Sequence, residues 1–479
     1  MDQEKLHVAI IASPGVGHLL PVLLLANRLV IYHNITTTIL AVTTQTSYLE
    51  SQTLTKSSHI KIIKIPLPDT SNLLGEADSV FTRLTVIMRE ARHGIRSAIS
   101  TMNPCPHVLI ADLFACESLP IGNEFHMQKY VYVPCNAWFV ALTTYLHVLD
   151  KEVEGEYVDW VKPLRIPGCR PVRREDLPDA MWDRSNRQYD EYVKMGVDFT
   201  TLSDGILTNT WKDMDPRCLD AFKCDETLRS FVKVPVYDIG PLTREVGVIN
   251  LKGNKVIEWL NMQPLKSVLF VSFGSGGTLS FKQISELAWG LEMSQQRFVW
   301  VVRPPPRVGN ASDGAFFSAR NGSDITLDFL PEGFLTRTKE LGLVIPMWAP
   351  QVDILNHGSI GGFLTHCGLN SVNESIKSGV PMIAWPLYAE QTMNATLLTE
   401  DLKVAIRPSV LPTKEVVDRE EIEKMVRRLM KGEEKKAMMD NVKLLKESVK
   451  EALEVNGSSY NSMCDFINCC QMKMKSSKK

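Results

Sequence analysis

The residues of this 479-residue chain that could do chemistry stand where short apolar runs end. His18 follows the glycine-bearing segment 13–17, and Asp112 follows the apolar run 108–111. An imidazole can act as a general base, and a carboxylate can orient it and stabilise the imidazolium. Each residue also has a structural alternative, because a histidine can pack at a helix start and an aspartate there is a common N-cap. The two positions predict a base and its partner, with capping as the alternative.

Two further segments carry glycines and hydroxyls after apolar runs. Residues 270–278 (FVSFGSGGT) and 361–374 (GGFLTHCGLNSVNE) each run from a predicted strand into a turn before a helix. Backbone N–H groups at such places bind phosphate. The second segment would gather its diphosphate donors from His366, Gly368, Asn370 and Ser371. The alternatives are a plain turn for the first segment and a capping box over 371–374 for the second.

Other polar and aromatic residues near these turns suit the remaining parts of a sugar nucleotide. Trp348 offers a flat face for a base and Gln351 an amide for its edge, while Glu374 could accept from ribose hydroxyls. The adjacent Glu390 and Gln391 provide the acceptor and donor groups that sugar hydroxyls need.

Two common nucleotide motifs are incomplete. A dinucleotide fingerprint with glycines at 15 and 17 needs its third glycine at position 20, which is Leu20 here. Segment 270–278 lacks the GKS or GKT ending of a P-loop. These departures disfavour a nicotinamide cofactor and ATP with magnesium.

Short apolar runs alternating with helical patterns must position these residues. The predicted strands are 7–12, 37–42, 107–111, 129–133, 267–272, 297–302, 342–346, 362–365 and 381–385. Helical spacing covers 19–31 and 81–99, and 304–328 has the composition of a surface loop. Alternating strands and helices predict parallel sheets with right-handed crossovers. We expect two Rossmann-like α/β domains whose ligand crevices face each other across a cleft.

Composition excludes several classes of protein. Lys and Arg number 53 against 55 Asp and Glu, so the net charge of −2 provides no field for nucleic acid. The ten cysteines lack the spacing of a zinc site or a disulfide framework. The polar start MDQEKL and the short apolar run after it predict no secretion signal and no membrane span. We therefore expect a cytoplasmic protein without stable membrane insertion, and a monomer.

The combined motifs resemble the plant family 1 UDP-sugar glycosyltransferases. Residues 348–391 match the 44-residue signature box of that family at full length, and PGVGH, LIADLF, VSFGSGGT and LPEGF extend the likeness over nearly the whole chain. The resemblance implies the GT-B fold. It is strongest to the group that glucosylates phenolics such as monolignols, hydroxycoumarins, simple phenols and flavonoids.

The resemblance also implies roles for individual residues. His18 would be the general base and Asp112 its partner. Donor binding would fall to Ser275, Trp348, Ala349, Gln351, His366, Gly368, Asn370, Ser371, Glu374, Glu390 and Gln391. In the family, a Gln at the last position of the box, here Gln391, indicates glucose as the transferred sugar. The sequence departs from the family at Leu369, where the pattern has Trp, and at Asn373, where Leu is usual.

The function expected from this resemblance is inverting, metal-independent transfer of glucose from UDP-glucose to a phenol, without a cofactor. Attack by a ring carbon, giving a C-glycoside, and a binding protein without turnover are the alternatives. Candidates for the acceptor pocket are Phe81, Trp138, Phe139, Trp182 and Phe199. The predicted divisions are an acceptor domain (1–244), a linker (245–252), a donor domain (253–455) and a C-terminal segment (456–479) whose helix returns to the first domain.

Overall fold

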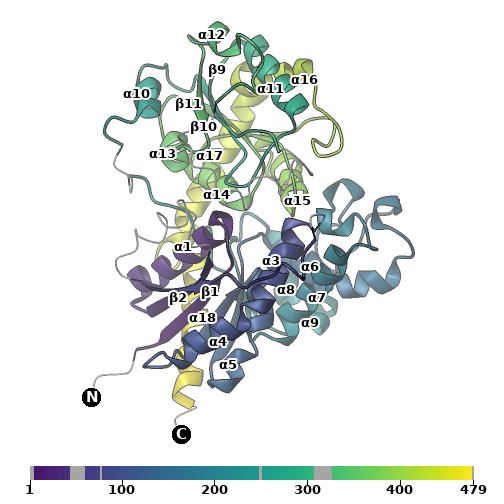
Figure 1. Ribbon diagram of the computed structural model, residues 1–479, viewed down its shortest axis with the longest axis vertical. Helices are drawn as coiled ribbons and strands as arrows, with labels where there is room; N and C mark the ends of the chain where they lie inside the picture. The colour runs from purple at the N-terminus through teal and green to yellow at the C-terminus, as the bar shows by residue number, and fades with distance from the viewer. Residues whose placement is uncertain (1–4, 44–59, 76–77, 248–250, 307–325, 477–479) are drawn as a thin grey trace. The chain divides into compact units, whose positions relative to one another are not determined.

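The computed structural model describes residues 5–43, 60–75, 78–247, 251–306 and 326–476, which form two compact units (Figure 1). The first unit comprises Met1–Leu242 and Lys450–Lys479, and the second comprises Thr243–Val449. The chain thus rejoins the first unit at Lys450, whereas we predicted the return from residue 456. Residues 307–325 of the predicted surface loop and 248–250 of the predicted linker lie outside the described residues.

A seven-stranded parallel sheet in the order β3-β2-β1-β4-β5-β6-β7 forms the centre of the first unit. Its strands are β1 (His7–Ala12), β2 (Thr36–Thr43), β3 (Lys61–Pro66), β4 (Val108–Asp112), β5 (Gln128–Val133), β6 (Ile206–Thr208) and β7 (Val236–Asp238). The strand order reverses direction between β1 and β4. Ligands of open α/β sheets bind at such a switch point, beyond the carboxyl ends of the strands.

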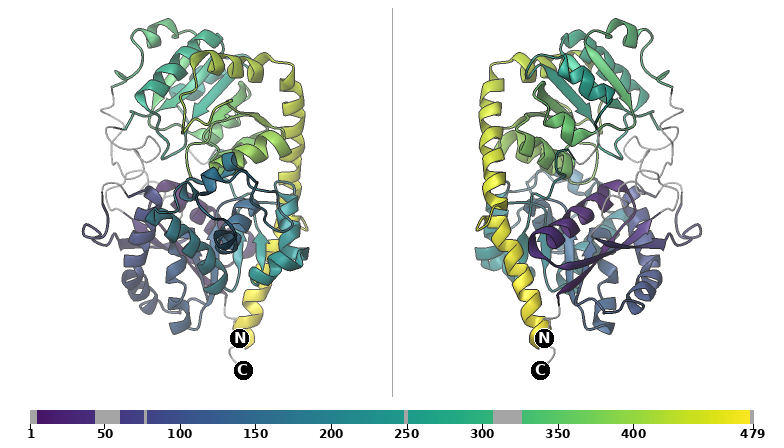
Figure 2. Two further views of the ribbon diagram at one scale, coloured as in Figure 1. Left: turned by 90° about the vertical axis from the view of Figure 1, so that its right-hand side faces the viewer. Right: turned by 90° about the vertical axis from the view of Figure 1, so that its left-hand side faces the viewer.

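Helices cover this first sheet. They are α1 (Val16–His33), α3 (Val80–Glu90), α4 (Arg92–Ser100), α5 (Ile121–Glu124), α6 (Ala137–Glu152), α7 (Arg187–Thr201), α8 (Pro216–Cys224), α9 (Glu226–Phe231) and α18 (Ser458–Ser476), with 3-10 turns η1 (Leu113–Ser118), η2 (Tyr157–Asp159), η3 (Arg174–Asp176) and η4 (Asp179–Met181). The predicted helix 81–99 is two helices that meet at Ala91. Figure 2 shows α18, in yellow, running along the first unit, where Met463, Phe466 and Cys470 join the core of the sheet.

Helix α1 is long and apolar enough, by length and composition, to cross a membrane. This corrects our expectation that the chain has no such segment. The apolar residues of α1 have another use, because Leu19, Val22, Leu25 and Leu29 are buried in the core of the first unit. A helix packed in the core of a protein can have the same apolar composition as a short membrane span.

A six-stranded parallel sheet in the order β10-β9-β8-β11-β12-β13 forms the centre of the second unit. Its strands are β8 (Val268–Ser272), β9 (Arg297–Val302), β10 (Gly342–Pro346), β11 (Ile360–Thr365), β12 (Met382–Ala384) and β13 (Ala405–Ile406). The helices are α10 (Lys255–Asn261), α11 (Phe281–Ser294), α12 (Phe334–Arg337), α13 (Gln351–Leu355), α14 (Leu369–Ser378), α15 (Gln391–Thr396), η6 (Leu397–Asp401), α16 (Arg419–Lys431) and α17 (Glu434–Leu453). The switch point of this sheet lies between β8 and β11.

Candidate active site

The first cluster of predicted site residues lies at the switch point of the first sheet. The register pairs Ile11 of β1 with Ala111 of β4, so Ser13 and Asp112 leave neighbouring strands together. The Asp112 carboxylate accepts from the Ser13 backbone N–H at 2.7 Å and from the Ser13 hydroxyl. Its other oxygen accepts from the Ala115 N–H at 3.1 Å and so caps η1. Asp112 is therefore an N-cap, and it is also anchored to the loop that leads to His18.

His18 lies in the first turn of α1, two residues after the helix begins at Val16. The helix starts there because Gly15 adopts a φ of 100°, which only glycine takes readily. Desolvation lowers the pKa of His18 to about 4, and burial raises the pKa of Asp112 to about 6. At neutral pH the imidazole is uncharged and can accept a proton, while the carboxylate is ionised.

Aromatic rings gather beside His18. The centroid of the Phe114 ring lies 5.0 Å from that of the imidazole, in an edge-to-face arrangement. Phe81 packs edge-on against both Phe114 (5.2 Å) and Tyr192 (5.9 Å), and Phe139 stacks on Tyr192 at 6.1 Å. These five rings bring together α1, α3, η1, α6 and α7. Phe114, Phe139 and Tyr192 are buried, so the rings form a packed apolar cluster, and such a cluster suits the wall of a site for a flat phenolic ligand.

Phe81 and Phe139 thus join the aromatic cluster, and the other predicted acceptor residues take different places. Trp138 is fully buried, and its indole N–H donates to the Arg170 carbonyl at 2.9 Å. Phe199 is also fully buried. The Trp182 indole donates to the carbonyl of Leu177 at 3.3 Å. The packing of Trp138 and Phe199 is that of core residues, so their role in an acceptor pocket stays a prediction.

The second cluster lies at the switch point of the second sheet. Gly274, in the turn after β8, has a φ of 74°, and a Cβ on it would lie 2.5 Å from the His366 ring. A Cβ on Gly368 would lie equally close, at 2.5 Å from His366 Nε2. His366 is 8% exposed, and burial together with the Arg303 cation lowers its pKa to about 4. Two glycines therefore make the space for a neutral imidazole, and Ser275 is exposed at the same turn.

The position at which α14 begins tests the capping-box alternative for residues 371–374. The N-cap is Gly368, which makes no side-chain cap, and the helix begins at Leu369. Ser371 is therefore inside the first turn, so the capping-box alternative over 371–374 is wrong. Asn370 also lies in this turn, and its buried Oδ1 has no hydrogen-bond partner among the described residues. The polar side chains of the first turn, Asn370 and Ser371, therefore do not cap the helix. They lie beside the N–H groups of a helix start, which favour an anion.

Glu374 lies one turn further on and is held by two donors. Arg244 donates to both of its carboxylate oxygens, at 2.9 and 3.2 Å, and Gln351 Nε2 donates at 2.7 Å. The same Gln351 nitrogen donates to the Ser371 hydroxyl at 3.0 Å. One hydrogen-bonded group therefore joins Gln351, Ser371 and Glu374, although Gln351 and Glu374 are 23 residues apart in the sequence.

The remaining predicted donor residues differ in exposure. Trp348 is 43% exposed, which is unusual for this side chain and leaves a ring face available, whereas the neighbouring Ala349 is buried. Glu390 accepts from Asn394 at 3.2 Å. The amide oxygen of Gln391 accepts from the backbone N–H groups of Leu387 (2.8 Å) and Tyr388 (3.1 Å). Gln391 thus fixes the β12–α15 loop, and its contact with a sugar stays a prediction.

Several residues that hold these groups in place were not predicted from the sequence. Ser13 was detectable, because it follows β1 directly and neighbouring strand ends of a parallel sheet meet. Arg303 carried a signal too, since it is a charged residue at the end of the apolar run 297–302. Arg244, by contrast, comes from a segment without a periodic pattern, and its pairing with Glu374 is a tertiary contact.

Comparison with known proteins assigns the family. Residues 249–454 match the family model described as UDP-glucoronosyl and UDP-glucosyl transferase. An anthocyanidin 3-O-glucosyltransferase 5 from Manihot esculenta is 50% identical, over 97% of this chain and 95% of its own. The chain belongs to the UDP-glycosyltransferase family. A hydroquinone glucosyltransferase from Rauvolfia serpentina is 40% identical over 98% of this UDP-glycosyltransferase and 99% of its own chain.

A solved structure agrees with this assignment. The structure of TcCGT1 in complex with UDP superposes with a TM-score of 0.91 at 46% identity, covering 98% of this UDP-glycosyltransferase and all of that chain. The predicted family, the GT-B α/β fold and the enzyme class are confirmed. The donor of this enzyme is a UDP-sugar.

Proposed function

We propose that this UDP-glycosyltransferase transfers glucose from UDP-glucose to the hydroxyl oxygen of a small phenol, with inversion at the anomeric carbon. The observation that carries the proposal is the neutral His18 imidazole beside the aromatic cluster of Phe81, Phe114, Phe139 and Tyr192. Anthocyanidin and hydroquinone, which appear in the names of two relatives, are both phenols. Monolignols, hydroxycoumarins and flavonoids share the same flat, hydroxylated ring.

In the proposed reaction His18 takes the proton from the phenol as the oxygen attacks the anomeric carbon. The new carbon–oxygen bond forms while the bond to the diphosphate breaks, and UDP leaves with the electron pair. The imidazolium formed on His18 is stabilised by the ionised Asp112, which Ser13 holds in place. In this proposal the base belongs to the first unit and the donor residues belong to the second.

In the second unit, we assign the uracil to the exposed face of Trp348 and the ribose hydroxyls to Glu374. The diphosphate would bind at the start of α14, where N–H groups, Asn370 and Ser371 meet His366. These fixed dipoles would stabilise the charge that develops on UDP, so the chemistry needs neither a metal nor a cofactor. Glu390 and Gln391 are the proposed partners of the glucose hydroxyls. We propose that the enzyme works as a cytoplasmic monomer.

The test is to incubate the purified protein with UDP-glucose and a panel of phenols, and to measure UDP release, product mass and the stability of the product to acid. The proposal predicts UDP release with a phenol and an acid-labile product that is one hexose heavier. An acid-stable product would show attack by a ring carbon instead. UDP binding without release, for every phenol and donor tried, would show a binding protein without turnover.

A further inference from the structure

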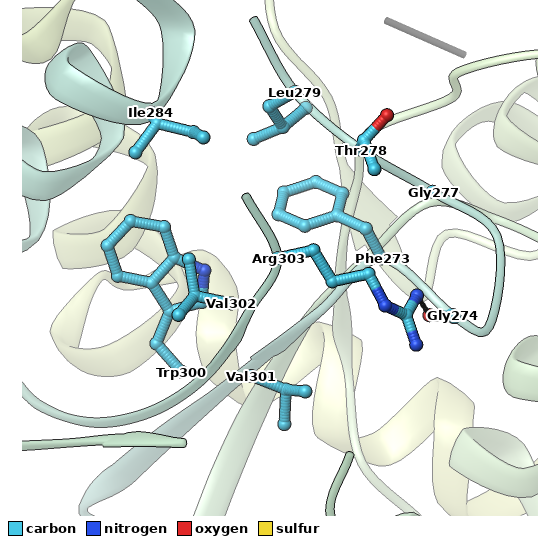
Figure 3. Close-up of a pocket in the computed structure, with 10 residues that line it drawn as sticks. All are labelled: Phe273, Gly274, Gly277, Thr278, Leu279, Ile284, Trp300, Val301, Val302 and Arg303. Atoms are coloured by element: carbon cyan, nitrogen blue, oxygen red, sulfur yellow. Dashed lines mark hydrogen bonds between the residues drawn. The ribbon is translucent and has the colours of Figure 1, made fainter. Parts of the chain in front are cut away.

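Arg303 is a buried cation that the proposed reaction does not use. It follows β9, is 9% exposed, and extends its guanidinium to the turn after β8 (Figure 3). One terminal nitrogen donates to the Gly274 carbonyl, and the other donates to the Met347 carbonyl at 3.0 Å. The side chain therefore links the loop after β8 to the loop after β10. Together with Phe273, Thr278 and Trp300 it lines a small recess.

Within the described part of the chain, no acid balances the charge of Arg303. No carboxylate of the described residues influences its pKa, and its Nε has no hydrogen-bond partner among them. Burial lowers the pKa of Arg303 to about 10, which still leaves it protonated at neutral pH. Burying a cation without an opposite charge is costly, so proteins rarely retain such a group unless it has a use.

Both loops that Arg303 holds carry residues of the donor site. Gly274 lies against the His366 ring, and Met347, whose φ is 65°, directly precedes Trp348. The positive charge also acts on His366, because it contributes to lowering the pKa of that imidazole. The cation is therefore placed behind the residues assigned to the diphosphate, and an anion there would supply the missing negative charge.

We propose that Arg303 is a positioning residue for the diphosphate of the donor: it fixes the Gly274 turn and supplies positive charge behind His366. The inference rests on the proposed function only in assigning the diphosphate to this end of the second sheet. It adds a residue outside the 44-residue box of 348–391 to the donor site.

The test compares the affinities of UDP and uridine, measured by calorimetry, for two variants. Arg303→Gln keeps a hydrogen-bond donor and removes the charge, whereas Arg303→Lys keeps the charge and cannot span both carbonyls. We expect Arg303→Gln to weaken UDP binding at least about tenfold and to change uridine binding less than about threefold, because uridine carries no diphosphate. Arg303→Lys should weaken UDP binding less than Arg303→Gln does.

Arg419→Met is the matched control, because Arg419 belongs to the same unit and is paired with Glu286 at 2.6 Å. It should leave both affinities unchanged. Equal losses of UDP and uridine affinity, an unchanged UDP affinity, or a Lys variant as weak as the Gln variant would overturn the proposal. If Arg303→Gln does not fold, as judged by thermal melting, the UDP-to-uridine comparison in Arg303→Lys decides alone. A wild-type protein that binds UDP but glucosylates no phenol would refute the proposed function and leave this comparison intact.

Discussion

At the scale of single residues, the chemistry depends on side chains at the carboxyl ends of strands. His18 and Asp112 could be predicted from sequence because each follows an apolar run, and the topology of parallel sheets makes such positions functional. The contacts that hold these side chains in place could not be predicted from the sequence. That Ser13 anchors Asp112, or that Arg244 holds Glu374, depends on which segments meet in space.

The pH dependence of activity should report on Asp112. Its pKa is raised to about 6 by burial, so the carboxylate loses its charge as the pH falls through 6, while His18, with a pKa of about 4, stays neutral. We expect kcat/KM to fall below pH 6 with one apparent pKa near that value. Asp112→Asn should have low activity and lack this acidic limb. An acidic limb near pH 6.5 in Asp112→Asn would instead show that His18 titrates there.

At the scale of elements, loops that leave β8 and β11 create the space for His366. A side chain at Gly274 would be strained by the φ of 74° and would meet the imidazole at 2.5 Å. Gly274→Ala should therefore lower the free energy of unfolding by about 1 kcal/mol and also weaken UDP binding. Chemical denaturation and calorimetry with UDP measure the two effects separately.

Gly253→Ala separates backbone strain from the clash with His366. Gly253 has a φ of 77°, and no atom of the residues that the structure describes lies within 4 Å of a Cβ there. This variant should lose less stability than Gly274→Ala, because it carries the strain without the clash, and should keep normal UDP affinity. If Gly274→Ala also binds UDP normally, the close approach of His366 has no role in the donor site.

The elements that could be predicted are those with a long apolar run. Strands β1, β9 and β10 begin and end at the predicted residues. Continuous apolar runs mark β1 and β9, which are buried, and also β10, which is a half-buried edge strand. Strands β6 and β7 have only three residues each, too few to show a pattern. The break at Ala91 between α3 and α4 was missed because apolar spacing continues through it.

At the scale of the whole molecule, the two units are similar in architecture, and the last helix belongs to the first. Phe466 of α18 is fully buried, with ring centroids 4.8 Å from Tyr130 and 5.8 Å from Tyr237. Phe466→Ala should lower the free energy of unfolding by about 3–5 kcal/mol, as for other buried phenylalanines. Met472→Ala, at a residue of the same helix that is 66% exposed, should be neutral by the same denaturation measurement. Similar stabilities for both variants would show that α18 does not contribute to the core.

The whole-molecule charge of −2 is consistent with an anionic donor because binding is assigned to local groups. Helix α14, the glycine turn and a buried arginine act at short range, where low dielectric makes each of them stronger than a diffuse surface charge. The donor site could therefore be predicted from the sequence motifs but not from the composition.

The most direct test of the account is the effect of His18→Ala on turnover and on donor binding, measured on the same preparation. The account predicts that the rate of UDP release from UDP-glucose in the presence of a phenol falls by about 10²–10⁴-fold, which is the usual contribution of a general base. It also predicts that UDP affinity stays at the wild-type value, because the donor residues belong to the second unit. Normal turnover in His18→Ala would contradict the central claim that this imidazole is the base.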